Sequence, residues 1–314
     1  MKRVIFVVPA GVELFDLAGP VQVFHEAAAA GAPYRLVFAA QSARVDSAQL
    51  LALCDLERLP DDVGADDLVI VPGSASLRRD VLARARSIRP LVRWLRSAYD
   101  AGAVMSSVCV GAFALAAAGL LDGRKATTHW KRVDELQRAF PRAQVEANRL
   151  YVFDGRVATS AGIASGVDLA LALVERDCSS RVAAAAAREM VVTARRPGHH
   201  EQLSPYFALR DHTSREVHLV QDWLVEHAGA PFTLSSLAAI AGVSERTLTR
   251  QFRAATGSSV KAYATTLRLE QARTLLRDRT LSIGSVAERC GFADARQLRR
   301  LWRTHFANSP SRER

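Results

Sequence analysis

Apolar residues in the first half of the chain occur as short continuous runs separated by amphipathic segments. Runs of this kind are typical of strands that are buried on both faces of a parallel sheet. They lie at 2–9, 34–40, 68–71 and 103–108. Apolar residues at helical spacing follow at 16–30, 90–99 and 112–120. Strands that alternate with helices predict an α/β domain of three layers.

The pattern changes further along the chain. Short strands are predicted at 144–148, 150–153 and 157–160, and closing helices at 166–176 and 179–192. Residues 193–212 lose this periodicity, so they are expected to link the first domain, 1–192, to a second one. Residues 213–314 show only helical patterns, so the second domain is expected to be all-α.

One helix-turn-helix pattern occurs twice in the second domain. Residues 237–252 and 286–302 each place a short apolar-faced helix, a turn with glycine and an amphipathic helix in succession. The copies are 49 residues apart before the turn and 50 residues apart after it, so the second turn holds one extra residue. Residues 260–277 predict a long helix between the copies.

The amphipathic helix of each copy has an apolar face and a basic face. Leu248 and Phe252, and likewise Leu298 and Trp302, are expected to point inward. The outward positions are Arg246, Thr249, Arg250, Arg253, Arg296, Gln297, Arg299 and Arg300. A recognition helix contacts bases and phosphates of DNA from such positions. A second interpretation remains open, in which several of these arginines contact phosphate only or stay in solvent.

The net positive charge of the chain comes almost entirely from residues 244–314. The formal net charge is +10, and residues 244–314 hold 15 Lys and Arg against 6 Asp and Glu. The other residues therefore carry a net charge of only +1. A basic segment attached to a neutral one suggests a polyanionic partner for that segment. An arginine-rich surface without such a partner is the alternative.

The second domain resembles the DNA-binding domain of AraC/XylS-type regulators over about residues 215–311. The resemblance is carried by the two copies, by Ala-x-x-Cys-Gly-Phe at 287–292 and by Ser-Pro-Ser at 309–311. It implies that both units enter successive major grooves on one face of double-stranded DNA. The chain departs from the family pattern at Val260, Ala307 and Glu313. The loss of glycine at 307 predicts an irregular last turn.

Cys109 lies where a predicted strand meets a predicted helix. Small residues surround it in Ser-Ser-Val-Cys-Val-Gly-Ala-Phe at 106–113. A sharp turn there would lift the thiol above the sheet and point a helix N-terminus at it, which lowers a thiol pKa. A buried, inert cysteine explains the segment equally well. The four cysteines are widely spaced, so neither a disulfide framework nor a zinc site is expected.

Three other segments accompany this cysteine: Leu-Phe-Asp-Leu-Ala-Gly-Pro at 14–20, Val-Pro-Gly-Ser at 71–74 and Thr-Thr-His-Trp at 127–130. With the cysteine turn they resemble the PfpI-like branch of the class I glutamine amidotransferase-like superfamily, over about residues 3–190. The resemblance implies a flavodoxin-like sheet with a ligand pocket at its edge. The pocket residues that it implies are Asp16, Gly73, Ser74, Cys109, Val110 and His129.

These pocket residues have different implied roles. Asp16 would hold a carboxyl group near the thiol, Gly73 and Val110 would offer backbone N–H groups, and His129 would line the pocket. Val110 stands where many relatives have threonine, which weakens the case for catalysis more than the case for ligand binding. Alternatively, Asp16 caps its helix and His129 is a structural histidine.

Together the resemblances imply a transcriptional regulator of the AraC family that binds a DNA operator. Its first domain would sense an unknown small-molecule effector and mediate homodimer formation. No catalytic residue is assigned, although Cys109 with Asp16 is a candidate vestigial nucleophile. The alternatives are a cysteine-dependent hydratase or hydrolase, similar to isocyanide hydratases, and a thiol redox sensor. No cofactor, metal or membrane span is expected, and the protein is expected in the cytoplasm.

Overall fold

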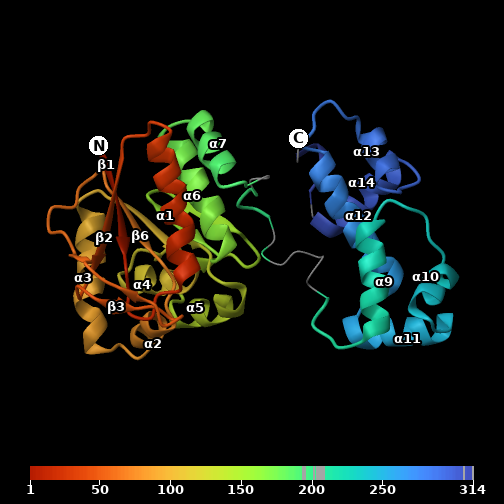
Figure 1. Cartoon of the computed structure of the whole chain (residues 1–314), viewed down its shortest axis with the longest axis horizontal. Coiled ribbons are helices and arrows are strands. Elements are labelled where there is room, and N and C mark those ends of the chain that lie inside the picture. Colours follow the sequence, from red (N-terminus) through yellow and green to blue (C-terminus); the bar gives the residue numbers. More distant parts are fainter. Residues whose placement is uncertain (193–195, 201, 203–208, 307, 313–314) are drawn as a thin grey trace. The chain divides into compact units, whose positions relative to one another are not determined.

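The computed structural model describes residues 1–192, 196–200, 202, 209–306 and 308–312 (Figure 1). The chain forms two compact units, Met1–Gln202 and Leu203–Arg314. The expected linker at 193–212 lies partly outside the described residues. Its residues 196–200 and 202 pack against the first unit, where Arg196 forms an ion pair with Asp168 at 2.6 Å. The first unit therefore continues beyond the expected boundary at residue 192.

The first unit is built on a sheet whose described strands are β1 (Lys2–Val7), β2 (Tyr34–Ala40), β5 (Glu57–Arg58), β6 (Leu68–Val71), β7 (Val104–Val108), β10 (Tyr151–Asp154) and β11 (Val157–Ser160). Their order across the sheet is β10-β11-β7-β6-β1-β2-β5. Neighbours are parallel, except that β10 and β11 form an antiparallel hairpin. Phe6 lies between Phe38 and Ile70 in this register and is fully buried.

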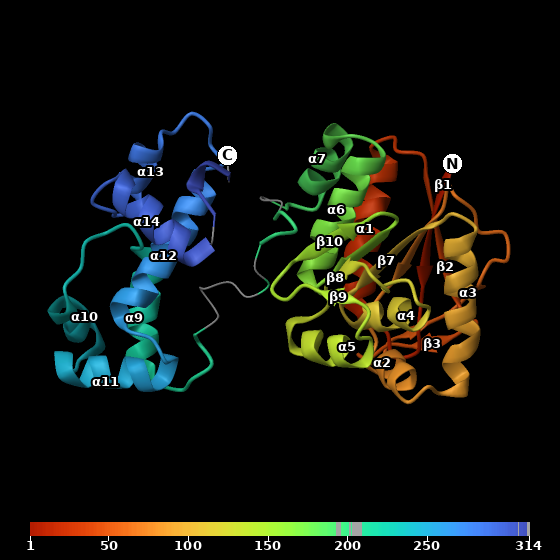
Figure 2. The same ribbon diagram turned by 180° about the vertical axis from the view of Figure 1, so that it is seen from behind.

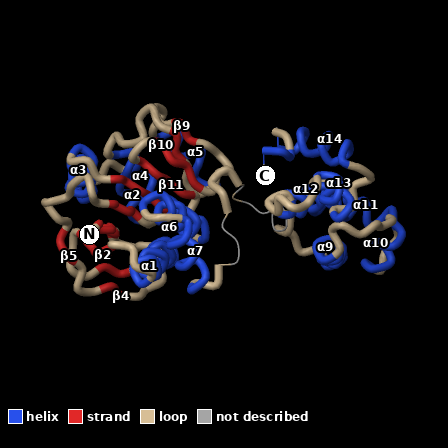
Figure 3. The backbone as a smooth tube through the Cα atoms, turned by 90° about the horizontal axis from the view of Figure 1, so that it is seen from above, coloured by secondary structure: helices blue, strands red, loops and turns tan. Residues whose placement is uncertain are grey.

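Helices cover both faces of the sheet (Figure 3). One face carries α1 (Leu14–Ala29), α6 (Ala164–Asp177) and α7 (Ser180–Glu189). The other carries α2 (Ala75–Leu82), α3 (Arg89–Asp100), α4 (Ala112–Ala117) and α5 (Val133–Ala139). The expected three-layer α/β fold is confirmed. Helices α2 and α5 were not predicted.

Several short strands complete the first unit. β3 (Val45–Asp46) pairs with β4 (Ala52–Leu53), and β8 (Lys125–Ala126) pairs with β9 (Gln144–Val145). The strand expected at 144–148 is therefore only two residues long. Among the described residues, no helix has the length and apolar character needed to cross a lipid bilayer.

The described helices of the second unit are α9 (Arg215–Glu226), α10 (Leu234–Ala241), α11 (Glu245–Thr256), α12 (Val260–Leu275), α13 (Ile283–Arg289) and α14 (Ala295–Phe306). The helix-turn-helix pairs α10–α11 and α13–α14 lie toward opposite ends of α12 (Figure 2). Each pair has a core of its own, the first around Leu248 and Phe252 and the second around Leu298 and Trp302. Ala307 and Glu313, where the chain departs from the family pattern, lie outside the described residues.

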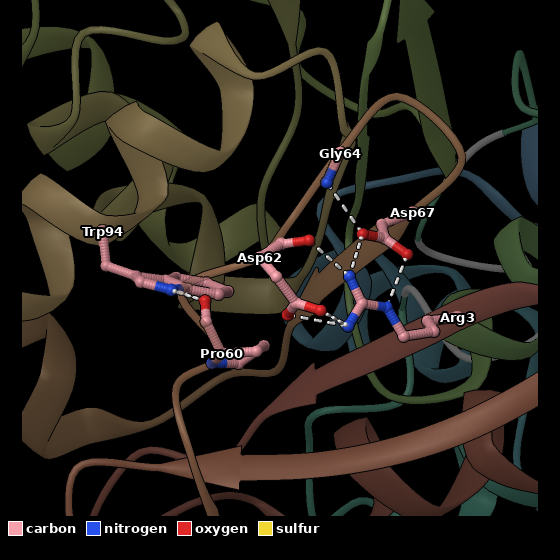
Figure 4. A network of polar contacts seen from close by, with 6 residues as sticks. All are labelled: Arg3, Pro60, Asp62, Gly64, Asp67 and Trp94. Atoms are coloured by element: carbon pink, nitrogen blue, oxygen red, sulfur yellow. Dashed lines mark hydrogen bonds and ion pairs between the residues drawn. The ribbon is translucent and has the colours of Figure 1, made fainter.

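An arginine near the N-terminus ties the sheet to the loop that precedes β6 (Figure 4). The guanidinium group of Arg3 donates two hydrogen bonds to the Asp67 carboxylate, at 2.9 and 2.7 Å, and also bonds Asp62. Asp67 is buried, and burial alone would raise its pKa. Arg3 and the N–H of Gly64 outweigh this effect and hold the pKa of Asp67 below its usual value.

Arg3→Gln should destabilise the first unit by about 3 kcal/mol, because it leaves the Asp67 carboxylate buried without its cation. Hydrogen exchange of the β1 amides, measured by mass spectrometry on the full chain, should accelerate roughly a hundredfold. Arg44→Gln is the control, because Arg44 pairs with Asp46 at 3.7 Å with both side chains about two-thirds exposed or more (68% and 70%). Its effect should stay below about 1 kcal/mol.

The effect of Arg3→Gln on stability should also depend on pH. A lowered carboxyl pKa stabilises the fold above the unfolded pKa of about 4, and this contribution is lost as the pH falls through the folded value. The difference between Arg3→Gln and the wild-type protein should therefore shrink as the pH is lowered from about 5 toward 3. A constant difference over that range would contradict the assigned role of Asp67.

Candidate functional site

Cys109 occupies a strained turn between β7 and α4. Its φ of 57° lies in the left-handed region, which a non-glycine residue seldom adopts. The turn needs glycine two residues later, because a Cβ at Gly111 would overlap the carbonyl oxygen of Val71. On the other side, the Thr128 hydroxyl donates a 2.8 Å hydrogen bond to the Cys109 carbonyl. The cysteine is therefore held in the sharp turn that the sequence predicted.

Asp16 reaches this turn from the first turn of α1. Its side chain is fully buried, and Oδ1 accepts a 2.7 Å hydrogen bond from the N–H of Ile163. Oδ2 has no partner with full hydrogen-bond geometry among the described residues, although the Cys109 thiol and the Gly73 N–H lie near enough to the carboxyl group to act against the rise of its pKa. It lies so close to Gly73 that a Cβ there would overlap it, and that Cβ would be 3.1 Å from the Cβ of Cys109. Asp16 thus faces the cysteine rather than capping its own helix.

The electrostatics of this pair differ from the sequence expectation. Burial, followed by the neighbouring Asp16, raises the pKa of Cys109 far above its ordinary value. Burial also raises the pKa of Asp16. The helix N-terminus was expected to lower the thiol pKa, but α4 has only six residues and the thiol is only 8% exposed. Desolvation therefore outweighs the helix, and it favours the neutral thiol and the neutral carboxyl group.

The other expected pocket residues differ in the groups that they contact. The Ser74 hydroxyl donates to the carbonyl of Ala10 at 2.6 Å and accepts the N–H of Leu77 at 3.1 Å, so it caps α2. The backbone N–H of Val110 acts against the raised pKa of the Cys109 thiol. The imidazole of His129 is half-buried and accepts the N–H of Lys131 at 3.4 Å.

Sequence reasoning missed the segment after β11. A Cβ at Gly162 would overlap Cys109, and the next residue, Ile163, has a φ of 47° with its side chain 51% exposed. A glycine directly between a buried strand and a helix was the available signal. No three His, Cys, Asp or Glu side chains among the described residues converge as a metal site.

The second candidate site is the outer face of α11 and α14. Ser244 caps α11 by accepting the N–H of Thr247 at 3.2 Å. The expected DNA-contacting arginines are exposed and form no ion pair within the described part of the chain: Arg246, Arg250, Arg253, Arg296, Arg299 and Arg300. Their positive charges therefore face solvent without a protein carboxylate to neutralise them.

The two polar residues of this face are partly engaged within the protein. The carboxamide oxygen of Gln297 accepts the N–H of Ala293 at 2.7 Å, while Asp294 accepts the N–H of Gln297 at 2.6 Å. Gln297 therefore helps to cap α14, which the sequence reading did not anticipate. Thr249 is exposed, and its hydroxyl donates to the carbonyl of Glu245 at 2.8 Å.

A groove of about 770 Å³ lies between the two helix-turn-helix pairs. Thr249 of α11 lines it from one side, and Gln297 and Arg300 of α14 line it from the other. Lys261 and Arg268 of α12 contribute positive charge to the same lining. The outer faces of both amphipathic helices therefore border one basic depression.

Comparisons with known proteins agree with both units. Residues 2–176 match the model of the DJ-1/PfpI family, and residues 237–314 match a helix-turn-helix domain model. The HTH-type transcriptional regulator CdhR of Pseudomonas aeruginosa is 34% identical over 73% of this chain and 68% of its own length. GbdR of the same species, also an HTH-type transcriptional regulator, is 30% identical over 86% of this chain and 73% of its own length.

Solved structures support the fold of the first unit. A THiJ/PfpI family protein from Pseudomonas syringae has a TM-score of 0.54 and 22% identity, covering 76% of this chain and 90% of that one. An AraC family transcriptional regulator from Pseudomonas putida has a TM-score of 0.51 and 20% identity, covering 60% of this chain and all of that one. The chain belongs to the DNA-binding transcriptional regulators that join a DJ-1/PfpI domain to an AraC-type helix-turn-helix domain.

Proposed function

We propose that the first unit binds a small-molecule effector at Asp16 and Cys109 and so controls operator binding by a homodimer. The observation that carries this proposal is the unpartnered, buried Oδ2 of Asp16. An unsatisfied buried polar atom costs about 1–3 kcal/mol, so a ligand that bonds it gains a partner that the empty site lacks. Burial raises the pKa of this carboxyl group and so favours its protonated form, for which a suitable ligand would offer a hydrogen-bond acceptor.

Access to Asp16 supports a sensing role. The carboxyl group is fully buried under Gly73 and the cysteine turn, so a ligand that bonds Oδ2 must displace the turn. Binding would then favour one conformation over the other, which is the requirement for any effector. The positive φ values of Cys109 and Ile163 mark the backbone that such a displacement would relax.

A chain of hydrogen bonds leads from the turn to the end of the first unit. The Thr128 hydroxyl bonds the Cys109 carbonyl, and the Thr128 carbonyl accepts a 3.1 Å bond from Nε2 of Gln202. The same amide group donates to the carbonyl of Arg149 at 3.0 Å. Gln202 is the last residue of the first unit, so a shift of the turn would reach the end of that unit.

The enzymatic and redox alternatives receive less support. A cysteine nucleophile and an oxidation sensor both need a thiolate, and burial here raises the pKa of Cys109. A ligand pocket needs no thiolate. Expected site residues that remain part of this proposal are Gly73 and Val110 as backbone donors and His129 at the pocket edge, whereas the Ser74 hydroxyl is already occupied.

The homodimer is proposed to form through the first unit. Phe15 precedes Asp16 in the chain and Ile163 donates its N–H to Asp16, and both apolar side chains are more than half exposed, as expected of an interaction surface. Sedimentation velocity of the full chain at micromolar concentration should give the mass of a dimer. A Phe15→Ser variant should dissociate more readily than a Leu50→Ser control, whose side chain is also exposed.

Arg250→Ala and Arg300→Ala should each relax base specificity at single operator positions. An arginine that bonds guanine discriminates against other bases by about 1–3 kcal/mol, so the preference should fall about tenfold or more at that position. The measurement is binding to the duplex that the wild-type protein selects from random DNA and to its single-base variants. Arg215→Ala removes the same charge from α9 and should leave base preferences unchanged.

An arginine that contacts phosphate instead of a base would give a different result. If an arginine variant binds all sequences more weakly by one factor and shows a shallower salt dependence, that arginine contacts phosphate. A dimer should also select two copies of its site, arranged as a palindrome or as a direct repeat.

Asp16→Asn and Cys109→Ala should abolish the effector response while changing operator affinity by less than about threefold.

Asp16→Asn should also raise the free energy of unfolding at neutral pH. A raised carboxyl pKa makes stability fall as the pH rises from the unfolded pKa of about 4 toward the folded value, and asparagine removes this penalty. Thermal denaturation of the variants measures the change in stability. Thermal shift with a panel of metabolites, followed by a reporter assay, measures the effector response.

Cys54→Ala is the matched control, because Cys54 is an exposed free cysteine outside the site. Loss of operator binding by folded Asp16→Asn would contradict the division between sensor and DNA reader. Turnover of isocyanides or small amides by the purified wild-type protein, lost in Cys109→Ala, would favour the enzyme instead.

A further inference from the structure

The two helix-turn-helix pairs do not share a hydrophobic core. Residues of α9, α10, α11 and the first half of α12 form one cluster, and residues of α13, α14 and the second half of α12 form the other. Tyr263 and Leu267 belong to the first cluster, and Leu269 and Ala272 to the second. Apolar packing therefore holds each recognition helix to its own half of α12, and no apolar cluster of the described residues joins the two pairs directly.

Arg268 lies on α12 between these two groups and bonds both sides. Nε donates to the carbonyl of Ala228 at 2.9 Å and Nη2 to the carbonyl of Ala230 at 2.8 Å, both in the connection from α9 to α10. Nη1 donates to the carbonyl of Gly291 at 3.0 Å, in the turn of the second pair. One rigid, planar guanidinium group thus holds three carbonyl groups from two separately packed segments.

Two glycines bring these segments into direct backbone contact. A Cβ at Gly291 would overlap the carbonyl oxygen of Gly229, and a Cβ at Gly229 would overlap the carbonyl oxygen of Arg289. Neither position has room for a side chain. The backbone contact and the guanidinium group therefore join the α9–α10 connection to the turn of the second pair, in addition to the packing of both pairs on α12.

The turn of the first pair provides an internal comparison. Gly242 has a φ of 67° and Gly291 a φ of 71°, so both need glycine for the same conformational reason. A Cβ at Gly242 would meet no atom within 4 Å, whereas one at Gly291 would overlap the Gly229 carbonyl oxygen in the connection from α9 to α10. The glycine thus has the same backbone conformation in both turns, and only the glycine of the second turn lies at the junction.

We propose that Arg268 is a positioning residue which, with the Gly229–Gly291 contact, sets the spacing between the two DNA segments that α11 and α14 read. The inference rests on the proposed DNA contacts of those helices. Major grooves on one face of DNA recur every 10–10.5 base pairs. A protein whose two recognition helices are held at one separation therefore accepts one spacing, and a loosened junction accepts several.

The test is selection of binding sites by the full chain from duplexes that contain about 30 random base pairs. The wild-type protein should enrich two short motifs at a single spacing. One inserted base pair between them should weaken binding about tenfold or more, comparable with one mismatched base pair. For Arg268→Ala and Gly291→Ala the same insertion should cost less than about threefold, with both motifs unchanged.

Gly242→Ala is the matched control, because it introduces the same unfavourable φ without touching the junction. It should lower stability and retain the wild-type spacing preference. Arg268→Lys keeps the charge but loses the planar fork, so it should fall between Arg268→Ala and the wild-type protein. If Arg268→Ala does not fold, Arg268→Lys and Gly291→Ala test the proposed role of Arg268 in spacing.

Two results would overturn the inference in distinguishable ways. Variants that bind every duplex more weakly but keep the wild-type spacing preference would show that Arg268 contributes stability only. Selection of a single motif by the wild-type protein would instead overturn the proposed two-helix DNA contact, and the inference with it.

Discussion

The first unit is organised around a carboxyl group buried beside a thiol. Hydrophobic packing alone would exclude Asp16 from this position, because an ionised carboxylate loses several kcal/mol of hydration there. The structure accommodates it by donating the Ile163 N–H and by leaving no side chain at Gly73, while burial raises the carboxyl pKa and so favours the protonated form. The strained Cys109 turn and the small residues around it follow from that arrangement.

Much of this fold follows from sequence patterns, and the exceptions have physical reasons. The buried strands β1, β2, β6 and β7 were predicted because continuous apolar runs are strong local signals. Helix α2 was missed because only Leu77 and Val81 are buried along it, which gives a weak pattern. The amphipathic helices α11 and α14 were predicted together with their inward residues, because the same pattern occurs twice in the sequence.

Site prediction was harder because it depends on contacts between distant segments. Asp16, Gly73 and Cys109 converge as expected. Gly162 and Ile163 also reach the site, through tertiary packing that no local sequence pattern predicts. The sign of the thiol pKa shift depends on desolvation, which sequence does not reveal. Ser74 was expected at the ligand pocket and Gln297 at the DNA, and in the structure the side-chain oxygen of each accepts a backbone N–H at a helix end.

The separate cores of the two helix-turn-helix pairs bear on how such a regulator changes during evolution. Substitutions in groups that share no partners have nearly additive effects on stability. Under the proposed DNA contacts, a replacement on α11 would alter one half of the recognised sequence without a compensating change on α14. Operators would then drift one segment at a time, while the interval between the segments would depend on two backbone positions, Gly229 and Gly291, that have no room for a side chain.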